Sequence, residues 1–245
     1  MTLVLTDLPA ATQEAVGATR ERVAALHAEL PRNDLVVWTA GNVSERVPST
    51  DPKVPELLVI KPSGVSYDDL TPASMVVCTL DGRKIQDGTP AHLTPSSDTA
   101  AHAYVYAHLP HVGGVVHTHS TYATAWAARG EEIPCVLTMM ADEFGGPIPV
   151  GPFAIIGDDS IGRGIVETLR DSRSPAVLMR NHGPFTVGRD GRSAVKAAVM
   201  CEEVARTVHV SAQLGTPLPI DQQHIDTLYA RYQNVYGQHP ADDAR

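Results

Sequence analysis

Two histidines separated by a single residue offer the clearest chemistry in this sequence. His117 and His119 lie in the run GGVVHTHS, whose composition predicts a strand. Alternate residues of a strand project from the same face, so both imidazoles would face the same way. His182 ends a separate apolar run and precedes Gly183, where the backbone can turn sharply. Three imidazoles from two strand ends would hold a divalent ion and leave one coordination position open, as a catalytic zinc requires.

Asp98 is the acid best placed to accompany these histidines. It follows Ser96 and Ser97 and begins a segment predicted to be helical to about His108. A carboxylate here would serve either as a further metal ligand or as the N-cap of the helix, whose first amides lack partners. Short histidine motifs also occur by chance, as ordinary core or surface residues. The residues alone leave these alternatives open.

Three small polar turns in the N-terminal half are suited to a phosphate group. They offer hydroxyls, exposed amides and one lysine at the ends of predicted elements, which is the chemistry that binds a phosphate dianion. Taken singly, each is more often an ordinary turn. Together they predict substrate contacts at Asn42, Lys61, Ser63, Gly64, Ser96 and Ser97.

The elements that would position these residues alternate between strands and helices. Helical periodicity predicts helices over residues 12–30, 98–108, 121–128, 158–170, 190–214 and 220–232. Apolar runs predict strands at 57–60, 75–80, 83–85, 113–119, 176–181 and 184–187, a strand, glycine turn and strand within 34–47, and extended chain over 147–156. No linker interrupts the pattern, so a single α/β domain over residues 1–245 is expected.

Composition excludes several classes of function. The 245 residues carry a formal net charge of −9, which is the wrong sign for a nucleic-acid binder. No stretch approaches the roughly 18 uninterrupted apolar residues of a membrane span. The N-terminal residues lack the basic segment and long apolar run of a secretory signal. We therefore expect a cytoplasmic protein with a small anionic substrate and without a nucleic-acid or membrane partner.

With these residues assembled, the sequence resembles the class II aldolase and L-ribulose-5-phosphate 4-epimerase superfamily over roughly residues 12–238. The resemblance implies a single domain with a mostly antiparallel β-sheet flanked by helices. It also implies a divalent ion, Zn²⁺ or alternatively Mn²⁺ or Co²⁺, held by the three histidines with Asp98. The matching runs keep the order of the family: AGNVS (40–44), KPSG (61–64), SSDTAAH (96–102), GGVVHTHS (113–120) and RNHGPFTVG (180–188).

The epimerase branch is the more similar one. Fuculose-phosphate-type aldolases usually carry a glutamate where this chain has Asp98. The run ADEFGGPIP (141–149) resembles the epimerase segment that supplies a proton-transfer aspartate, which implies this role for Asp142. The run VYGQ (235–238) likewise implies a catalytic role for Tyr236, and Arg231 is implied as a phosphate contact. The chain departs from the pattern near Leu228, where the family has a histidine.

The implied activity is metal-dependent 4-epimerisation of L-ribulose 5-phosphate by retro-aldol cleavage and re-addition. Asp98, Asp142 and Tyr236 are the implied catalytic residues, with Tyr236 reaching the site from a neighbouring subunit of a homotetramer. Two alternatives stay open on the same scaffold. One is a class II aldolase acting on a substrate such as L-fuculose 1-phosphate, and the other is a structural member of the superfamily without catalysis.

Overall fold

Seven strands form one sheet, and nearly all of their residues are buried. The computed structural model describes residues 3–49 and 51–235. The strand order is β3-β2-β1-β4-β7-β6-β5. Every neighbouring pair is antiparallel except β5 and β6, which run parallel. The bounds are β1 (Asn42–Val47), β2 (Leu57–Ile60), β3 (Val76–Thr79), β4 (Gly114–His117), β5 (Val150–Gly151), β6 (Ala176–Met179) and β7 (Gly183–Gly188).

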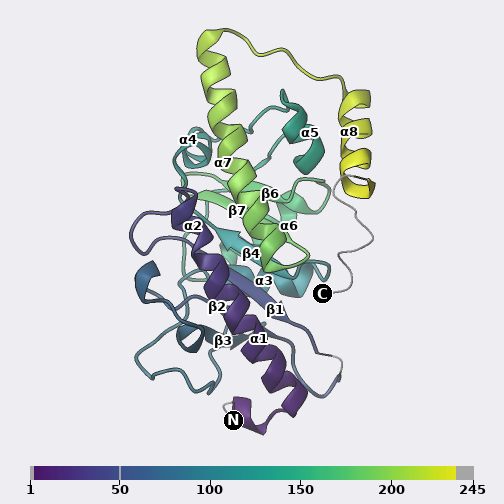
Figure 1. The fold of residues 1–245 in the computed structure, drawn as a ribbon. Coiled ribbons are helices and arrows are strands. Elements are labelled where there is room, and N and C mark those ends of the chain that lie inside the picture. The colour runs from purple at the N-terminus through teal and green to yellow at the C-terminus, as the bar shows by residue number, and fades with distance from the viewer. Residues whose placement is uncertain (1–2, 50, 236–245) are drawn as a thin grey trace.

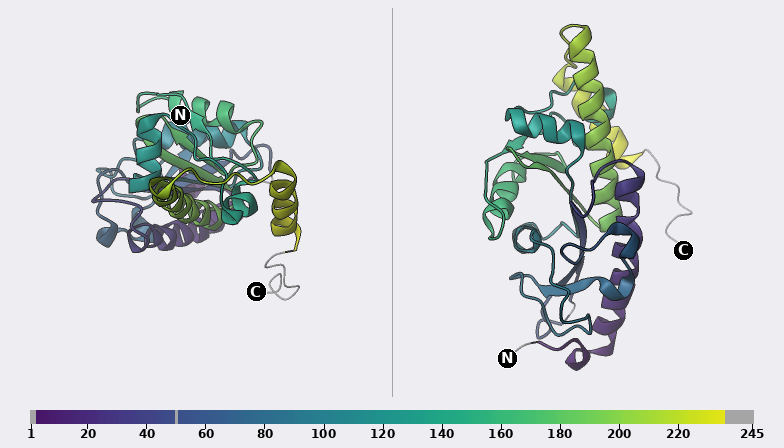
Figure 2. Two further views of the ribbon diagram at one scale, coloured as in Figure 1. Left: turned by 90° about the horizontal axis from the view of Figure 1, so that it is seen from above. Right: turned by 90° about the vertical axis from the view of Figure 1, so that its left-hand side faces the viewer.

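Helices cover both faces of the sheet (Figures 1 and 2). On one face, α1 (Ala10–His27) and the long α7 (Gly191–Leu214) pack against strand residues such as Val116, which clusters with Ala194. On the other, α3 (Thr99–His108) and α6 (Ser160–Leu169) pack against the alternate residues, such as Val115. Because both faces are covered, strands such as β2 and β6 read as continuous apolar runs, whereas β1 buries polar side chains as well.

The remaining helices lie around this three-layer body. α4 (Thr121–Arg129) packs beside α7, whereas α5 (Thr138–Phe144) packs against the C-terminal α8 (Gln222–Asn234), away from the centre of the sheet (Figure 1). An ion pair between Arg173 and Asp226, at 2.6 Å, ties α8 to the loop before β6. The short helices are α2 (Glu29–Arg32) and the 3-10 turns Leu5–Asp7, Tyr67–Asp69 and Pro72–Ser74.

The expected fold class is confirmed: a mostly antiparallel sheet flanked by helices in one α/β domain. Two local predictions were wrong and one helix was missed. Residues 34–41 form turns rather than a strand, because Leu35 and Val36 already pack against Leu30 in the core. Residues 83–85 make only an isolated bridge from Lys84 to Cys78. α5 was not predicted, since its seven residues are too few for a clear helical period.

None of the helices among the described residues is long and apolar enough to span a membrane.

Gly114 provides a test of how closely α7 approaches the sheet. A Cβ at this position would lie 2.3 Å from the backbone oxygen of Asp190 and 2.5 Å from the nitrogen of Gly191. Backbone at the start of α7 would have to move, so Gly114→Ala is expected to lower the free energy of unfolding by about 2–3 kcal/mol. Urea unfolding measures this change.

Gly17→Ala is the matched control. Gly17 is exposed within α1, and a Cβ added to it would have no neighbour within 4 Å. The substitution should raise the free energy of unfolding by about 0.5–1 kcal/mol, because alanine loses less conformational entropy in a helix. Equal effects of the two substitutions would contradict the close approach at Gly114.

Candidate metal centre

Cross-strand pairing places the first histidine among polar and aromatic neighbours. In the register of β1, β4 and β7, His117 lies opposite Asn42 on one side and Phe185 on the other. Directly opposed residues share a face of the sheet. All three side chains therefore project toward the face that α3 covers, at the end of the central strand β4.

His117 is held in a single orientation. Its side chain is 1% exposed, and its ring stacks on Phe185 with 4.1 Å between centroids. Nδ1 lies 3.0 Å from the backbone oxygen of Pro184, and because a carbonyl only accepts, Nδ1 carries the proton. The lone pair of Nε2 is left free, 2.9 Å from Nε2 of His119. This is the tautomer of a metal-ligating histidine whose second nitrogen is fixed by a backbone carbonyl.

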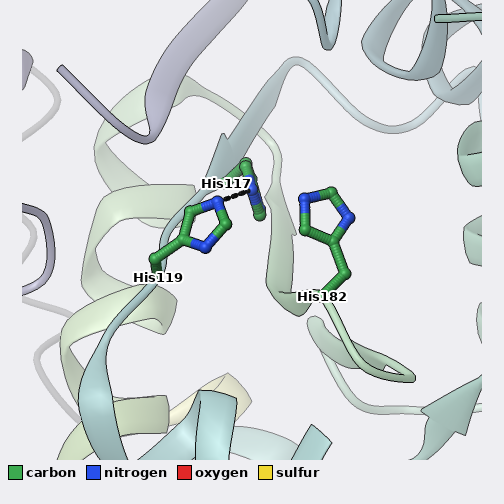
Figure 3. A group of neighbouring side chains, drawn as sticks. All are labelled: His117, His119 and His182. Atoms are coloured by element: carbon green, nitrogen blue, oxygen red, sulfur yellow. Dashed lines mark hydrogen bonds between the residues drawn. The ribbon is translucent and has the colours of Figure 1, made fainter. Parts of the chain in front are cut away.

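His119 and His182 come from two loops that meet this ring (Figure 3). His119 follows β4 and lies just before α4, whose first amides, those of Tyr122 and Ala123, donate to Glu202 of α7 at 2.8 Å each. His182 lies in the turn between β6 and β7. The next residue must be glycine, because a Cβ at Gly183 would lie 2.7 Å from the backbone oxygen of Thr118.

The three imidazoles suit a divalent ion. Their ligand nitrogens all lie within 4.8 Å of one another. Two nitrogens on a tetrahedral zinc are separated by about 3.4 Å, given Zn–N distances of about 2.0–2.1 Å. Burial lowers the pKa of all three histidines from the usual 6.5, that of His117 furthest. The rings are therefore neutral at pH 7, as metal ligands must be. The donor set fits the ion that the sequence predicts.

Asp98 faces the cleft rather than capping α3. It occupies the N-cap position, yet its carboxylate accepts no hydrogen bond from the helix amides among the described residues. Instead Oδ2 accepts from Nδ2 of Asn42 at 2.7 Å, and the same amide nitrogen donates to Oγ of Ser96 at 3.0 Å. The negative charge raises the pKa of His119 and His182, opposing the effect of burial. The carboxylate therefore lies beside the imidazoles, although the group of atoms within 4.8 Å contains only the histidines.

A cleft of about 270 Å³ joins the histidines to the polar turns. It contains every predicted metal ligand and every predicted substrate contact except Arg231. Sequence reasoning did not single out Thr39, Ala40 or Ile156, which also line it and have no chemical signature of their own. The lining residues are Thr39, Ala40, Gly41, Asn42, Lys61, Pro62, Ser63, Gly64, Ser96, Ser97, Asp98, His117, His119, Ile156 and His182.

Lys61 supplies the positive charge of this cleft. It is 2% exposed, and Nζ donates to the backbone oxygens of Thr39 at 3.2 Å and Pro62 at 3.3 Å. The ammonium also lies over the ring of Tyr67, 5.3 Å from its centroid. Burial lowers the pKa of Lys61 to about 8, so it is still mostly protonated at pH 7. Because its hydrogen-bond partners are neutral carbonyls, the charge is available to an anionic substrate.

Of the predicted site residues, two lie away from the cleft and one lies outside the described part of the chain. Asp142 is on α5 and Arg231 is exposed on α8, and neither lines the cleft with the histidines. Tyr236 lies outside the described residues. The catalytic roles of Asp142 and Tyr236, and the phosphate contact of Arg231, stay predictions.

The first strand of the site is anchored by a histidine that sequence reasoning missed. His27, at the end of α1, lies 2.7 Å from the backbone oxygen of Val23 through Nδ1. Its Nε2 accepts from the backbone amide of Val43 at 2.9 Å, next to Asn42. Burial lowers the pKa of His27 to about 3. No local motif marks such a residue, because its two partners come from different elements.

A mostly antiparallel sheet with three imidazoles gathered at the end of its central strand defines an α/β protein with a candidate site for a divalent metal ion. The model of the Class II Aldolase and Adducin N-terminal domain family matches residues 21–209. The chain belongs to this family.

Curated relatives and solved structures agree with this assignment. The chain is 39% identical to L-ribulose-5-phosphate 4-epimerase UlaF of Salmonella paratyphi C (strain RKS4594) over 222 residues, which cover 86% of this chain and 93% of the relative. An L-fuculose 1-phosphate aldolase superposes with a TM-score of 0.77 at 22% identity, covering 88% of this chain and 96% of the aldolase. YgbL of Klebsiella pneumoniae, a putative aldolase/epimerase/decarboxylase, superposes with a TM-score of 0.70 at 27% identity, covering 87% and 98% of the two chains.

Removal of one imidazole tests the metal centre. The wild-type protein is expected to bind one divalent ion per chain after loading with Co²⁺ and gel filtration. His182→Ala should weaken binding by more than about 100-fold, since losing a ligand costs more than losing the group that orients one. Metal analysis and competition with a chelator measure the affinity. His92→Ala, at an exposed histidine outside the cleft, should bind like the wild type. A His182→Ala protein that retained its full complement of metal would refute the assignment.

Acid should destabilise the metal-free protein through its buried histidines. The unfolded chain takes up protons at His27 and His102 as the pH falls through 6.5, whereas in the folded protein burial holds the pKa of each at about 3. Stability is therefore full above pH 6.5 and declines below it, by about 1.4 kcal/mol per pH unit for each histidine. Urea unfolding at pH 7.5, 6 and 5 measures the slope. In His27→Gln the free energy of unfolding should fall less steeply with pH, by the contribution of one histidine, about 1.4 kcal/mol per pH unit. An unchanged slope would count against a buried, neutral His27.

Proposed function

We propose that this protein is a metal-dependent L-ribulose-5-phosphate 4-epimerase that works by retro-aldol cleavage and re-addition. The convergence of His117, His119 and His182 on a cleft that also holds Lys61 is the observation that carries the proposal. The 39% identity to curated 4-epimerases over most of both chains supports the choice of reaction. Inverting a carbon that bears no acidic proton cannot proceed by simple deprotonation. The proposed route breaks the carbon–carbon bond that a carbonyl two atoms away can release.

The three histidines would hold the ion, and Zn²⁺ suits three imidazoles best, with Mn²⁺ and Co²⁺ as alternatives. Bound there, a divalent ion supplies Lewis acidity toward the carbonyl and hydroxyl oxygens of the substrate. Asp98 lies next to the histidines with its charge directed by Asn42, either as a further ligand or as a base for a substrate hydroxyl. Either role requires the carboxylate to face the cleft rather than to accept hydrogen bonds from the first amides of α3.

The other end of the cleft would bind the phosphate. Lys61 provides a buried cation, and Ser63, Gly64, Ser96 and Ser97 provide hydroxyls and amides around it. This arrangement would hold the phosphorylated fragment after cleavage while its aldehyde group rotates and presents its opposite face. Retention of that fragment is what separates an epimerase from an aldolase, which releases it.

Proton transfer would come from a neighbouring subunit. Asp142 and Tyr236 are the proposed acid and base on opposite faces of the aldehyde, and Asp142 does not line the cleft of its own chain. The loops beside the cleft expose large apolar side chains, including Trp38 at 85% and Ile155 at 74%. Such exposure is typical of surfaces that another protein covers. We therefore propose a homotetramer whose active sites are shared between subunits.

Turnover of defined substrates tests the reaction. The metal-loaded protein is expected to convert L-ribulose 5-phosphate to D-xylulose 5-phosphate without release of free aldehyde. Tyr236→Phe should lower kcat by about 10²–10⁴-fold, the usual contribution of a positioned acid or base. Cleavage of L-fuculose 1-phosphate in place of epimerisation would instead establish the aldolase alternative.

Mixed oligomers test whether the site is shared. His182→Ala and Tyr236→Phe each disable every site of a pure oligomer. Co-assembled in equal amounts they should regain roughly a quarter of the wild-type kcat, because in a ring each site draws on two neighbouring chains. If the mixture stays as inactive as its components, the histidines and Tyr236 of one site belong to the same chain.

A further inference from the structure

A chain of buried polar side chains lies beneath the proposed metal centre, on the face of the sheet covered by α3. Oγ of Ser44 is 2.7 Å from Nδ1 of His102 and 2.8 Å from the hydroxyl of Tyr106. All three residues are at most 1% exposed. Burying three polar groups is costly compared with an apolar core of the same shape unless their hydrogen bonds are satisfied. The arrangement therefore calls for an explanation beyond packing.

The other end of this chain points to Asp98. His102 lies one helical turn after Asp98, and its backbone amide donates to the Asp98 carbonyl at 3.0 Å. Within the described residues, Nε2 of His102 and Oδ1 of Asp98 are both buried without a hydrogen-bond partner. One is a nitrogen that can carry a proton and the other is a carboxylate oxygen that accepts one. The two atoms are complementary.

The order of donors in the chain determines which nitrogen carries the proton. A phenol is a stronger donor than an aliphatic hydroxyl, which favours donation from Tyr106 to Ser44. The Ser44 hydroxyl is then free to donate to Nδ1 of His102, and this order gives every hydroxyl proton in the chain an acceptor. Burial lowers the pKa of His102 to about 3, so the ring is neutral and carries a single proton. This order of donors assigns the proton to Nε2, the nitrogen that does not contact Ser44.

We propose that His102 is a positioning residue whose Nε2–H serves Oδ1 of Asp98 through one water molecule, since the two buried atoms are not bonded to each other directly. With Asn42 donating to Oδ2, both carboxylate oxygens are then held, and the anion stays fixed beside the three histidines. The His102 ring also lies edge-on to Phe185, with 6.1 Å between the ring centroids, and Phe185 in turn stacks on His117. His102 thus supports the metal centre from behind without touching the ion. This inference rests on the metal-binding part of the proposed function and not on the identity of the sugar.

Two conservative substitutions separate the two nitrogens of His102. The amide nitrogen of glutamine reaches about as far as Nε2, whereas that of asparagine reaches only as far as Nδ1. His102→Gln keeps a donor toward Asp98 and should leave the Co²⁺ dissociation constant within about threefold of the wild type, while His102→Asn should raise it on the order of 10-fold. Chelator competition on purified protein without substrate gives both values. Equal affinities of the two variants would overturn the proposal.

A double-mutant cycle with Asp98 tests whether the effect passes through the carboxylate. In an Asp98→Asn background, His102→Asn is expected to change Co²⁺ affinity by less than about twofold, because the interaction it removes is already lost. Thermal melting provides the structural control, since His102→Gln should lower the melting temperature at least as much as His102→Asn. A loss of Co²⁺ affinity that persists in the Asp98→Asn background, or that follows the melting temperature, would show a merely structural role.

The wild-type protein offers a measurement that does not depend on the folding of these variants. In ¹⁵N-histidine-labelled, metal-loaded protein, the signals of His102 can be assigned through their shift in Ser44→Ala. They should report a neutral ring protonated at Nε2, and protonation at Nδ1 would overturn the proposal. A protein that binds Co²⁺ and shows this tautomer but does not epimerise L-ribulose 5-phosphate would refute the proposed reaction and leave the role of His102 standing.

Discussion

The candidate site depends on the buried imidazole of His117, which stays uncharged. Burial keeps His117 neutral by lowering its pKa. The single N–H of the ring donates a hydrogen bond to the Pro184 carbonyl, and stacking on Phe185 fixes the plane of the ring. The lone pair of Nε2 then has a single direction, toward His119 and His182. Because His117 is paired in register with Asn42 and Phe185, the pairing of three strands determines that direction. A shift of one residue in β4 would turn the ring to the opposite face, and the same shift in β1 or β7 would remove Asn42 or Phe185 from beside it.

The charges of the cleft are arranged locally and against the net charge of the chain. A protein of net charge −9 does not attract an anion by its overall field. Lys61 provides a buried cation whose partners are neutral, and Asp98 provides an anion beside the histidines. Both residues line the same cleft. A phosphorylated sugar, as the proposed substrate, carries the matching groups: a dianion for the cation and oxygens for a metal.

Much of this was predictable from the sequence because it follows from local patterns. The strand that carries His117 and the turns that carry Lys61, Ser96 and His182 follow short apolar runs and lie where they were expected. The strand before His119 is shorter than predicted, because β4 ends at His117 and His119 lies in the loop that follows. α5 and the loop at residues 34–41 were not, since one is too short for a helical period and the other is apolar only because Leu35 enters the core. The roles of His27 and His102 were out of reach, because their partners lie 16 and 58 residues away along the chain. From the sequence, Asp98 could either cap the helix or belong to the metal site. Its contact with Asn42 and its lack of a capping hydrogen bond among the described residues separate these alternatives.

The same contacts bear on the proposed division between binding and proton transfer. Holding a metal and a phosphate requires side chains with no freedom, and such side chains are found at buried strand ends, where Lys61 and His117 are at most 2% exposed. A group that exchanges protons with the rotating aldehyde must instead approach from the open side of the cleft. α8, which precedes Tyr236, packs on α5 and is held by the Arg173–Asp226 ion pair rather than lying over that opening. In the proposed homotetramer, proton transfer would therefore be assigned to a residue of an adjacent copy rather than to the chain that holds the metal and the phosphate.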